Sequence, residues 1–216
     1  MPVPFSSPSA DRFYEAVGSS TLNMKAHPML FVIVLSFAIS SNVRGDDTQS
    51  WVGKYYSVFN AEDEVGADAA FYHDVPANMR ADVFADILDR ALQAKNHTIV
   101  RNVVTMLRSD EYGPTPDWND HLTSSLLSIK TDSDPVSRAL LVSLLAKRHP
   151  KSLRKDVLSM MSDQDDEVRY RALEEVSSWP DAVAIYQAYI QAHQSDPAFA
   201  KAVRNAQGHV KLLQGK

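Results

Sequence analysis

The sequence predicts an all-α protein built from about four helical hairpins. Apolar residues recur at the i, i+3, i+4 spacing of helices along most of residues 76–213. Capping residues and prolines interrupt these stretches at short intervals. Helix starts recur with a period of about 31 residues, which suits a repeat of two helices that stacks on its neighbours.

The amino-acid composition excludes several classes of protein and of functional site. The 216-residue chain has 22 basic and 27 acidic side chains, a net charge of −5, 44% hydrophobic residues and no cysteine. Its length suits one or two folded domains, and its acidic balance argues against a nucleic-acid partner. The lack of cysteine excludes disulfides, thiol nucleophiles and thiolate metal sites. With 7 glycines and no G-x-G spacing, a dinucleotide or P-loop phosphate site is excluded as well.

Residues 24–45 have the pattern of a secretory signal peptide. Lys25 supplies a positive charge, eleven largely apolar residues follow at positions 29–39, and small polar residues come next. Eleven helical residues span about 16 Å, which is too short for a hydrocarbon core of about 30 Å. Cleavage is expected before Asp46, with residues 38–40 as a second site. A buried core helix or a retained membrane anchor is the alternative.

Residues 1–23 precede this segment and are expected to be a non-native N-terminal extension. They hold three prolines in the first ten positions and no periodic apolar pattern. Because a signal peptide normally begins at the initiator, Met24 is the expected start, and an unusually long leading region is the alternative. Residues 1–45 hold three basic and two acidic residues, so the mature net charge is −6. A cysteine-free exported chain indicates a periplasmic or secreted location.

Residues 46–75 are expected to form an aromatic helix followed by an acidic linker. Trp51, Tyr55 and Phe59 share one helical face within residues 48–60, whereas residues 62–74 are acidic and weakly patterned. The helix either covers the open end of the repeats or binds a partner. The acidic residues lack the ligand spacing of a calcium-binding EF-hand loop.

Residues 76–216 are expected to form the repeat domain, with helices of 11–18 residues. Its four helical pairs are predicted at 76–109, 116–148, 151–179 and 180–213. Thr115 is expected to cap the first helix of the second pair, with Pro116 at its first helical position. The second helices are expected to begin near Asn96, Asp134, Asp165 and Asp196.

One stretch resembles a known repeat family. From Asp165 the chain reads Asp-Asp-Glu-Val-Arg-Tyr-Arg-Ala-Leu-Glu-Glu-Val, which is similar to the second helix of a HEAT-like repeat. Residues 133–141 resemble it with the arginine shifted by one, and residues 195–197 keep only the cap. The resemblance covers residues 133–213, extends over 76–132, and implies a right-handed α–α solenoid. Other α-hairpin repeats are the alternative.

The search for catalytic groups finds no constellation. The seven histidines lack H-x-H and H-E-x-x-H spacings, and there is no G-x-S-x-G sequence. Ser152 and Lys155 match the S-x-x-K motif of penicillin-recognising serine enzymes, but the accompanying S-D-N and K-T-G motifs are missing. The sequence therefore predicts no catalytic residue, no metal site and no cofactor.

Each second helix carries one arginine outside its apolar stripe. The four are Arg101, Arg138, Arg169 and Arg204. They either form a positive stripe that binds a carboxylate-rich partner, or they bond the turns of adjacent repeats. In HEAT-like proteins the repeated aspartate and arginine are mostly structural, so the resemblance favours the second interpretation.

The expected function is that of an exported, non-catalytic scaffold or adaptor that binds another protein in the cell envelope. Membrane contact is expected only through the signal segment if that segment stays uncleaved, and no nucleic-acid contact is expected. A basic cluster at residues 147–155 is interpreted as mainly solvated. The alternatives are an enzyme or enzyme-accessory subunit related to HEAT-like lyases, and a structural or inhibitory module.

Overall fold

Regular secondary structure is helical throughout the residues that the computed structural model describes, which are 47–60, 67–109, 116–148 and 151–215. These ranges contain no strand, which confirms the predicted all-α class. They all belong to one structural unit, residues 42–216. The predicted extension, the signal segment and the cleavage site before Asp46 lie outside the described residues, as do Thr115 and residues 149–150 of the basic cluster.

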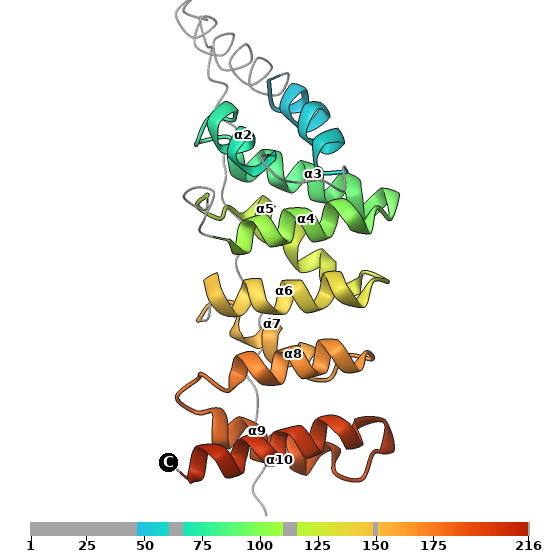
Figure 1. Cartoon of the computed structure of the whole chain (residues 1–216), viewed down its shortest axis with the longest axis vertical. Helices are drawn as coiled ribbons and strands as arrows, with labels where there is room; N and C mark the ends of the chain where they lie inside the picture. Colours follow the sequence, from blue (N-terminus) through green and yellow to red (C-terminus); the bar gives the residue numbers. More distant parts are fainter. Residues whose placement is uncertain (1–46, 61–66, 110–115, 149–150, 216) are drawn as a thin grey trace, which may run out of the picture. The chain divides into compact units, whose positions relative to one another are not determined.

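A helix over residues 47–58 opens the described part of the chain, and the later helices follow at short intervals (Figure 1). Their bounds are α2 Ala67–Asp74, α3 Arg80–Ala94, α4 His97–Arg108, α5 Asp120–Ser128, η1 Ile129–Thr131, α6 Pro135–Arg148, α7 Arg154–Met160, α8 Asp166–Val176, α9 Ala182–His193, η2 Pro197–Phe199 and α10 Ala200–Gln214.

The second helix of each predicted pair packs against the second helix of the next. Helix α6 lies between α4 and α8, and α10 packs against α8 and α9 (Figure 1). The first helices pack onto this layer, since α3 contacts α4, and α7 contacts both α6 and α8. Helices α4, α6, α8 and α10 therefore form one continuous layer in chain order.

The apolar stripes seen in the sequence form the core between these helices. Leu141, Leu144, Val168 and Leu173 are all 0% exposed. Burial of aliphatic side chains at helical spacing is the main stabilising contribution to such a layer. The predicted cap at Asp165 is also confirmed, because its carboxylate accepts a hydrogen bond from the backbone N–H of Glu167 at 2.9 Å.

The structure corrects three predictions about helices: one helix was missed, one begins at a different residue, and two are shorter than expected. The segment interpreted as an acidic linker contains helix α2, whose Phe71 is fully buried. The helix expected to begin at Pro116 begins at Asp120 instead, since the Asn119 side chain accepts from the N–H of Leu122 at 2.8 Å and caps it. Helices α5 and α7 have 9 and 7 residues, below the predicted 11–18.

The aromatic face of the 47–58 helix packs inward. Tyr55 and Phe59 are each 1% exposed. The ring of Phe71 lies 4.9 Å from that of Tyr55 and 4.3 Å from that of Phe84, centre to centre. These contacts use the aromatic face within the fold, as expected for a helix that covers the end of a stack.

Candidate functional site

The turn before α6 and the turn before α8 repeat the same set of contacts. In each turn the backbone N–H of the second aspartate donates to the carboxylate of the first, at 3.0 and 2.8 Å. In each, the arginine donates to the carbonyl oxygen of the first aspartate, at 2.6 Å in both cases. The two sets are Asp132, Asp134, Arg138 and Asp163, Asp165, Arg169. The sequence repeat around these residues is therefore also a repeat of geometry.

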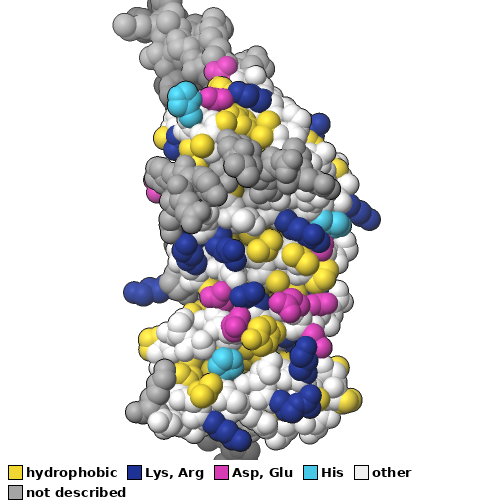
Figure 2. Space-filling model, in the orientation of Figure 1, with side chains coloured by type: hydrophobic (Ala, Val, Ile, Leu, Met, Phe, Trp, Pro, Cys, Tyr) yellow, Lys and Arg dark blue, Asp and Glu magenta, His cyan; other side chains and the backbone are white. Residues whose placement is uncertain are grey.

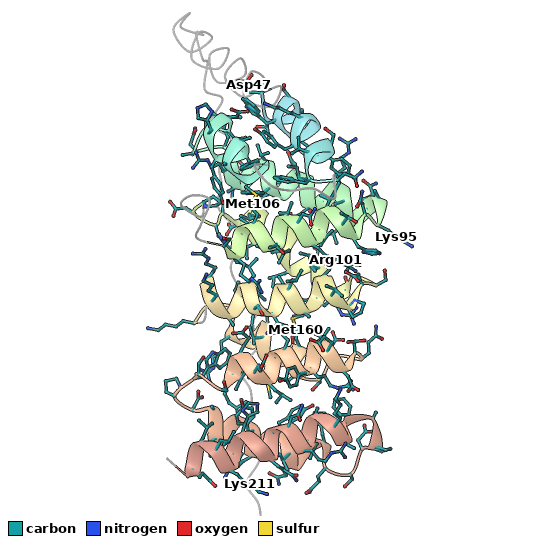
Figure 3. The ribbon with its side chains drawn as sticks, viewed as in Figure 1. Asp47, Lys95, Arg101, Met106, Met160 and Lys211 are labelled. Carbon is teal, nitrogen blue, oxygen red and sulfur yellow. The ribbon has the colours of Figure 1, made fainter. Side chains whose placement is uncertain are left out.

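Arginine–aspartate pairs link the helices of the continuous layer. Arg101 on α4, which is labelled in Figure 3, donates two hydrogen bonds to the Asp134 carboxylate, at 2.8 and 2.6 Å. Arg138 on α6 donates two to the Asp163 carboxylate, at 2.9 and 2.8 Å. Bidentate arginine–carboxylate pairs of this kind fix the relative orientation of the two side chains as well as their distance. Arg138 is only 2% exposed, so the second pair is enclosed.

Arg169 lacks the carboxylate that the repeat would place beside it. Gln194 stands one repeat period after Asp163, where an aspartate would complete the pattern. Arg169 instead pairs with Asp166 on its own helix and donates to the carbonyl oxygen of Ala198 at 3.0 Å. Its guanidinium lies 4.8 Å from the ring centre of Phe199. Its Nε is buried and has no hydrogen-bond partner among the described residues.

The structure does not bring the four predicted arginines together in one exposed stripe. Arg138 and Arg169 are 2% and 5% exposed, and the side chain of Arg101 is paired with Asp134. Only Arg204, on α10, is exposed and makes no hydrogen bond or ion pair with another described residue. The contacts of the first three are those expected if arginines bond adjacent turns.

The Arg101 pair also fixes the charge of its carboxylate. Burial by itself raises the pKa of Asp134, but hydrogen bonds from Arg101 and from Ser137 lower it, and the net result lies well below the usual range. Hydrogen bonding to Asp134 in turn raises the pKa of Arg101. Both partners are therefore charged across the physiological range, as a permanent structural link requires.

A second set of polar links joins the first helices of the pairs and was missed in the sequence. His121 on α5 lies 3.2 Å from Asp89 on α3, and Lys130 donates to Asp156 on α7 at 2.9 Å. Arg154 on α7 pairs with the Asp181 carboxylate at the start of α9. The members of these pairs lie 26 to 32 residues apart, so a search at the repeat period would have found them.

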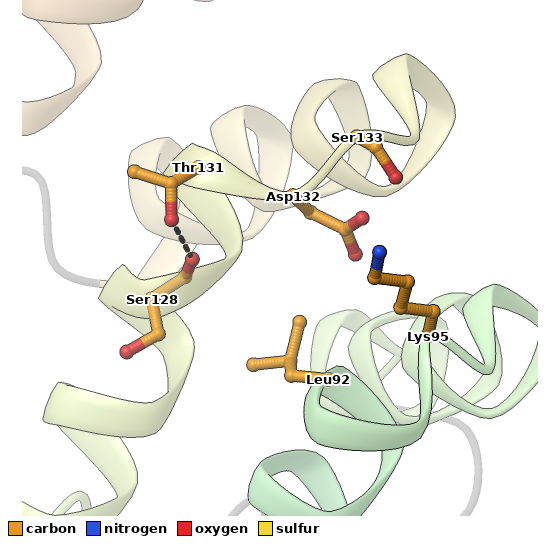
Figure 4. Close-up of a pocket in the computed structure, with 6 residues that line it drawn as sticks. All are labelled: Leu92, Lys95, Ser128, Thr131, Asp132 and Ser133. Atoms are coloured by element: carbon orange, nitrogen blue, oxygen red, sulfur yellow. Dashed lines mark hydrogen bonds between the residues drawn. The ribbon is translucent and has the colours of Figure 1, made fainter.

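A shallow pocket of 390 Å³ lies between the turn after α3 and the turn before α6 (Figure 4). Its polar groups are already engaged in part. The Asp132 carboxylate accepts from the N–H of Asp134 and lies 3.1 Å from Nδ1 of His97, and the Thr131 hydroxyl donates to the carbonyl of Ser128 at 3.0 Å. The pocket is lined by Leu92, Lys95, Ser128, Thr131, Asp132 and Ser133.

A serine–histidine contact is present outside the pocket. The hydroxyl of Ser162 lies 3.2 Å from Nε2 of His193. The imidazole stacks on Phe199 at 4.1 Å between ring centres, and no carboxylate among the described residues contacts its other nitrogen. A serine nucleophile needs such a third group and an oxyanion site, so this pair by itself lacks the remaining elements of a triad.

The exposed side of α10 gathers cations. Lys201, Arg204 and Lys211 are all exposed, and α10 contains no acidic residue. On the face shown in Figure 2, lysine and arginine side chains lie at the lower end, where α10 is found in Figure 1. The pattern of one arginine per second helix predicted Arg204 but not the two lysines. Their spacing in an acid-free helix was the signal that could have found them.

Within the described ranges, no helix has both the length and the apolar character needed to cross a bilayer. Nor does any group of three or more His, Asp or Glu side chains in these ranges have the geometry to hold a metal ion. No protein-family model matches the chain, and no curated protein or solved structure matches it.

Proposed function

We propose that this chain is an exported, non-catalytic HEAT-like repeat protein that serves as a protein-interaction scaffold in the cell envelope. In this proposal its hairpins form a right-handed α–α solenoid of about four repeats, closed at the N-terminal end by the aromatic helix. The packing of α4, α6, α8 and α10 in chain order supports a solenoid.

The observation that carries the proposal is the chain of arginine–aspartate pairs between successive helices. Two such pairs, Arg101–Asp134 and Arg138–Asp163, have donor–acceptor distances of 2.6 to 2.9 Å. Bonds of this kind hold the helices in a defined arrangement. A rigid stack offers a binding partner a preorganised surface, which lowers the entropic cost of association.

The proposal of export is supported by the sequence alone. Residues 24–45 have the order of charge, apolar run and small residues that a secretory signal peptide needs. A chain without cysteine needs no thiol protection in an oxidising compartment.

Two measurements on producing cells test the proposal. Fractionation followed by intact-mass spectrometry should find the protein in the envelope or periplasmic fraction with its first residue at or near Asp46. A cytoplasmic product, or peptides from residues 1–23, would refute that part.

Affinity purification at native expression level is the second measurement. It should recover a protein partner in a fixed ratio, and the purified pair should bind again in vitro. A chain that is monomeric and partner-free in cells, or one whose Ser162 is labelled by a fluorophosphonate probe, would favour the enzyme alternative.

A further inference from the structure

The outward face of α10 carries three cations that the fold does not use. Lys201, Arg204 and Lys211 are exposed and form no hydrogen bond or ion pair with another described residue. This contrasts with Arg101, Arg138 and Arg154, whose side chains are each paired with a carboxylate. In a chain of net charge −5, an acid-free helix with three uncompensated cations is a local exception.

These cations lie on one face, opposite the buried side of the helix. At 100° per residue, positions 201, 204, 208, 211 and 212 fall within roughly one third of the helix circumference. The side chains that α10 buries, Ala202, Val203 and Ala206, point the other way. Lys201 and Lys211 are ten residues apart, about 15 Å along the axis. Lys211 lies at the lower edge of the view in Figure 3.

A glycine with no internal role lies in the middle of this face. A Cβ atom at Gly208 would meet nothing within 4 Å, so the fold of the chain does not require a glycine at this position. Glycine inside a helix costs about 0.5–1 kcal/mol relative to alanine. Beside it, Leu212 is 68% exposed, the highest value among the large hydrophobic side chains that the structure describes. A residue without a side chain lets a second helix approach closely, and the exposed leucine beside it offers that helix an apolar contact.

We propose that this face, formed by Lys201, Arg204, Gly208, Lys211 and Leu212, binds a carboxylate-bearing amphipathic helix of a protein partner. This inference rests on the proposed scaffold function and names its binding surface. Carboxylates on successive turns of the partner pair with the three cations, and an apolar side chain packs on Leu212 over Gly208.

Charge and shape favour a protein over a lipid surface as the occupant. Amphipathic helices that bind bilayers bury a broad apolar face, whereas this face exposes one large apolar side chain, Leu212. The net charge of −5 also opposes approach of the whole chain to an anionic membrane. The glycine position lets the side-chain ridge of a second helix pack closely, whereas it adds no apolar side chain that could insert into a bilayer.

Site-specific photo-crosslinking of the full chain in producing cells tests the inference. Benzoylphenylalanine replaces Gln207, an exposed residue of α10 at the edge of this face, so that Gly208 stays flat, and in a matched control it replaces Gln93, an exposed glutamine of α3. The expected result is a protein adduct at position 207 and none at 93, with an acidic, helix-forming crosslinked peptide by mass spectrometry. Salt should weaken binding of the purified partner.

Charge reversal then tests the mechanism. The triple variant Lys201→Glu, Arg204→Glu, Lys211→Glu should weaken partner binding by about tenfold or more, with an unchanged melting temperature. The control variant Lys95→Glu, Lys151→Glu, Lys155→Glu changes the net charge equally at exposed positions and should bind as the wild type does. Gly208→Leu should also block binding, because it fills the flat position.

Several outcomes would overturn the inference. They are an adduct at 93 without one at 207, a non-acidic crosslinked peptide, an adduct with a second copy of the chain, or binding to phosphatidylglycerol vesicles that the triple variant abolishes. The first of these leaves the scaffold function standing with a different surface. Absence of any adduct together with absence of any copurified partner would refute the scaffold function too.

Discussion

The two ends of the described helical layer are finished in different ways. At the N-terminal end, the 47–58 helix and α2 pack aromatic rings against α3, and Tyr55, Phe59, Phe71 and Phe84 are at most 1% exposed. At the C-terminal end, α10 buries only Ala202, Val203 and Ala206. The first end of the described layer therefore covers its apolar face with aromatic rings, whereas the last described helix presents a polar face.

This difference separates structural burial from a surface available for binding. The four buried rings at the N-terminal end belong to the core, so they stabilise the fold and are inaccessible to a partner. The C-terminal end presents charge that no described internal group neutralises. We therefore expect the first end to contribute mainly to stability, and we propose the second end as the recognition surface.

The largest expected effect is at the aromatic end. Phe71→Ala should cost about 3–5 kcal/mol of unfolding free energy, because it leaves a cavity among packed rings. Leu212→Ala at the other end should change stability by less than about 0.5 kcal/mol, since that side chain is 68% exposed. Urea unfolding of both variants checks the contrast, and equal losses would show that the two ends are packed alike.

The arginine links should become less important toward the C-terminal end. Arg138→Met should cost about 3 kcal/mol because it leaves the Asp163 carboxylate buried without its partner. Arg169→Met should cost at most about 1 kcal/mol, because its carboxylate partner Asp166 is half exposed on the same helix and stays solvated without it. Denaturant titration of the two variants measures this gradient. A larger loss for Arg169→Met than for Arg138→Met would reverse it.

Acid should weaken the layer through Asp134. Its pKa is lowered in the folded state, so its contribution to stability is fully present above the unfolded pKa of about 3.9 and is lost as the pH falls through the folded value. The urea midpoint should therefore fall between pH 5 and pH 3 more steeply in the wild type than in Asp134→Asn. Parallel curves would mean that Asp134 does not contribute to acid sensitivity.

The smallest expected effects come from the two exposed helical glycines. Gly53→Ala and Gly208→Ala should each stabilise the isolated chain by about 0.5–1 kcal/mol, because alanine restricts the unfolded chain and neither Cβ meets another atom within 4 Å. Melting curves check both substitutions. Their stability changes should be additive, because the two glycines lie on different helices. A loss of stability in Gly208→Ala alone would indicate an internal packing role and weaken the assignment of this glycine to recognition.

Part of the fold and of the candidate site could be predicted because the signals are local. The cap at Asp165 involves the backbone two residues away, and the stripe of Leu141 and Leu144 follows from a 3.6-residue period. Arg204 was singled out as one arginine per repeat. Lys201 and Lys211 were missed because that search followed arginines alone.

Other features depend on distant contacts. Residues 67–74 carry a weak helical pattern, and α2 is stabilised where Phe71 meets Tyr55 and Phe84, which belong to two other helices. Likewise Pro116 looked like a helix start, but Asn119 caps the helix that begins at Asp120.

The sequence by itself determined the helical class, the repeat period and most caps, because these rest on interactions within one or two turns of the chain. Only the tertiary structure decided which of these arginines pair with a carboxylate. Arg101, Arg138 and Arg204 are equivalent in the sequence pattern, yet the first two meet carboxylates 33 and 25 residues further on. Arg204 meets none among the described residues, because pairing needs a neighbouring turn in space and α10 presents this side chain outward.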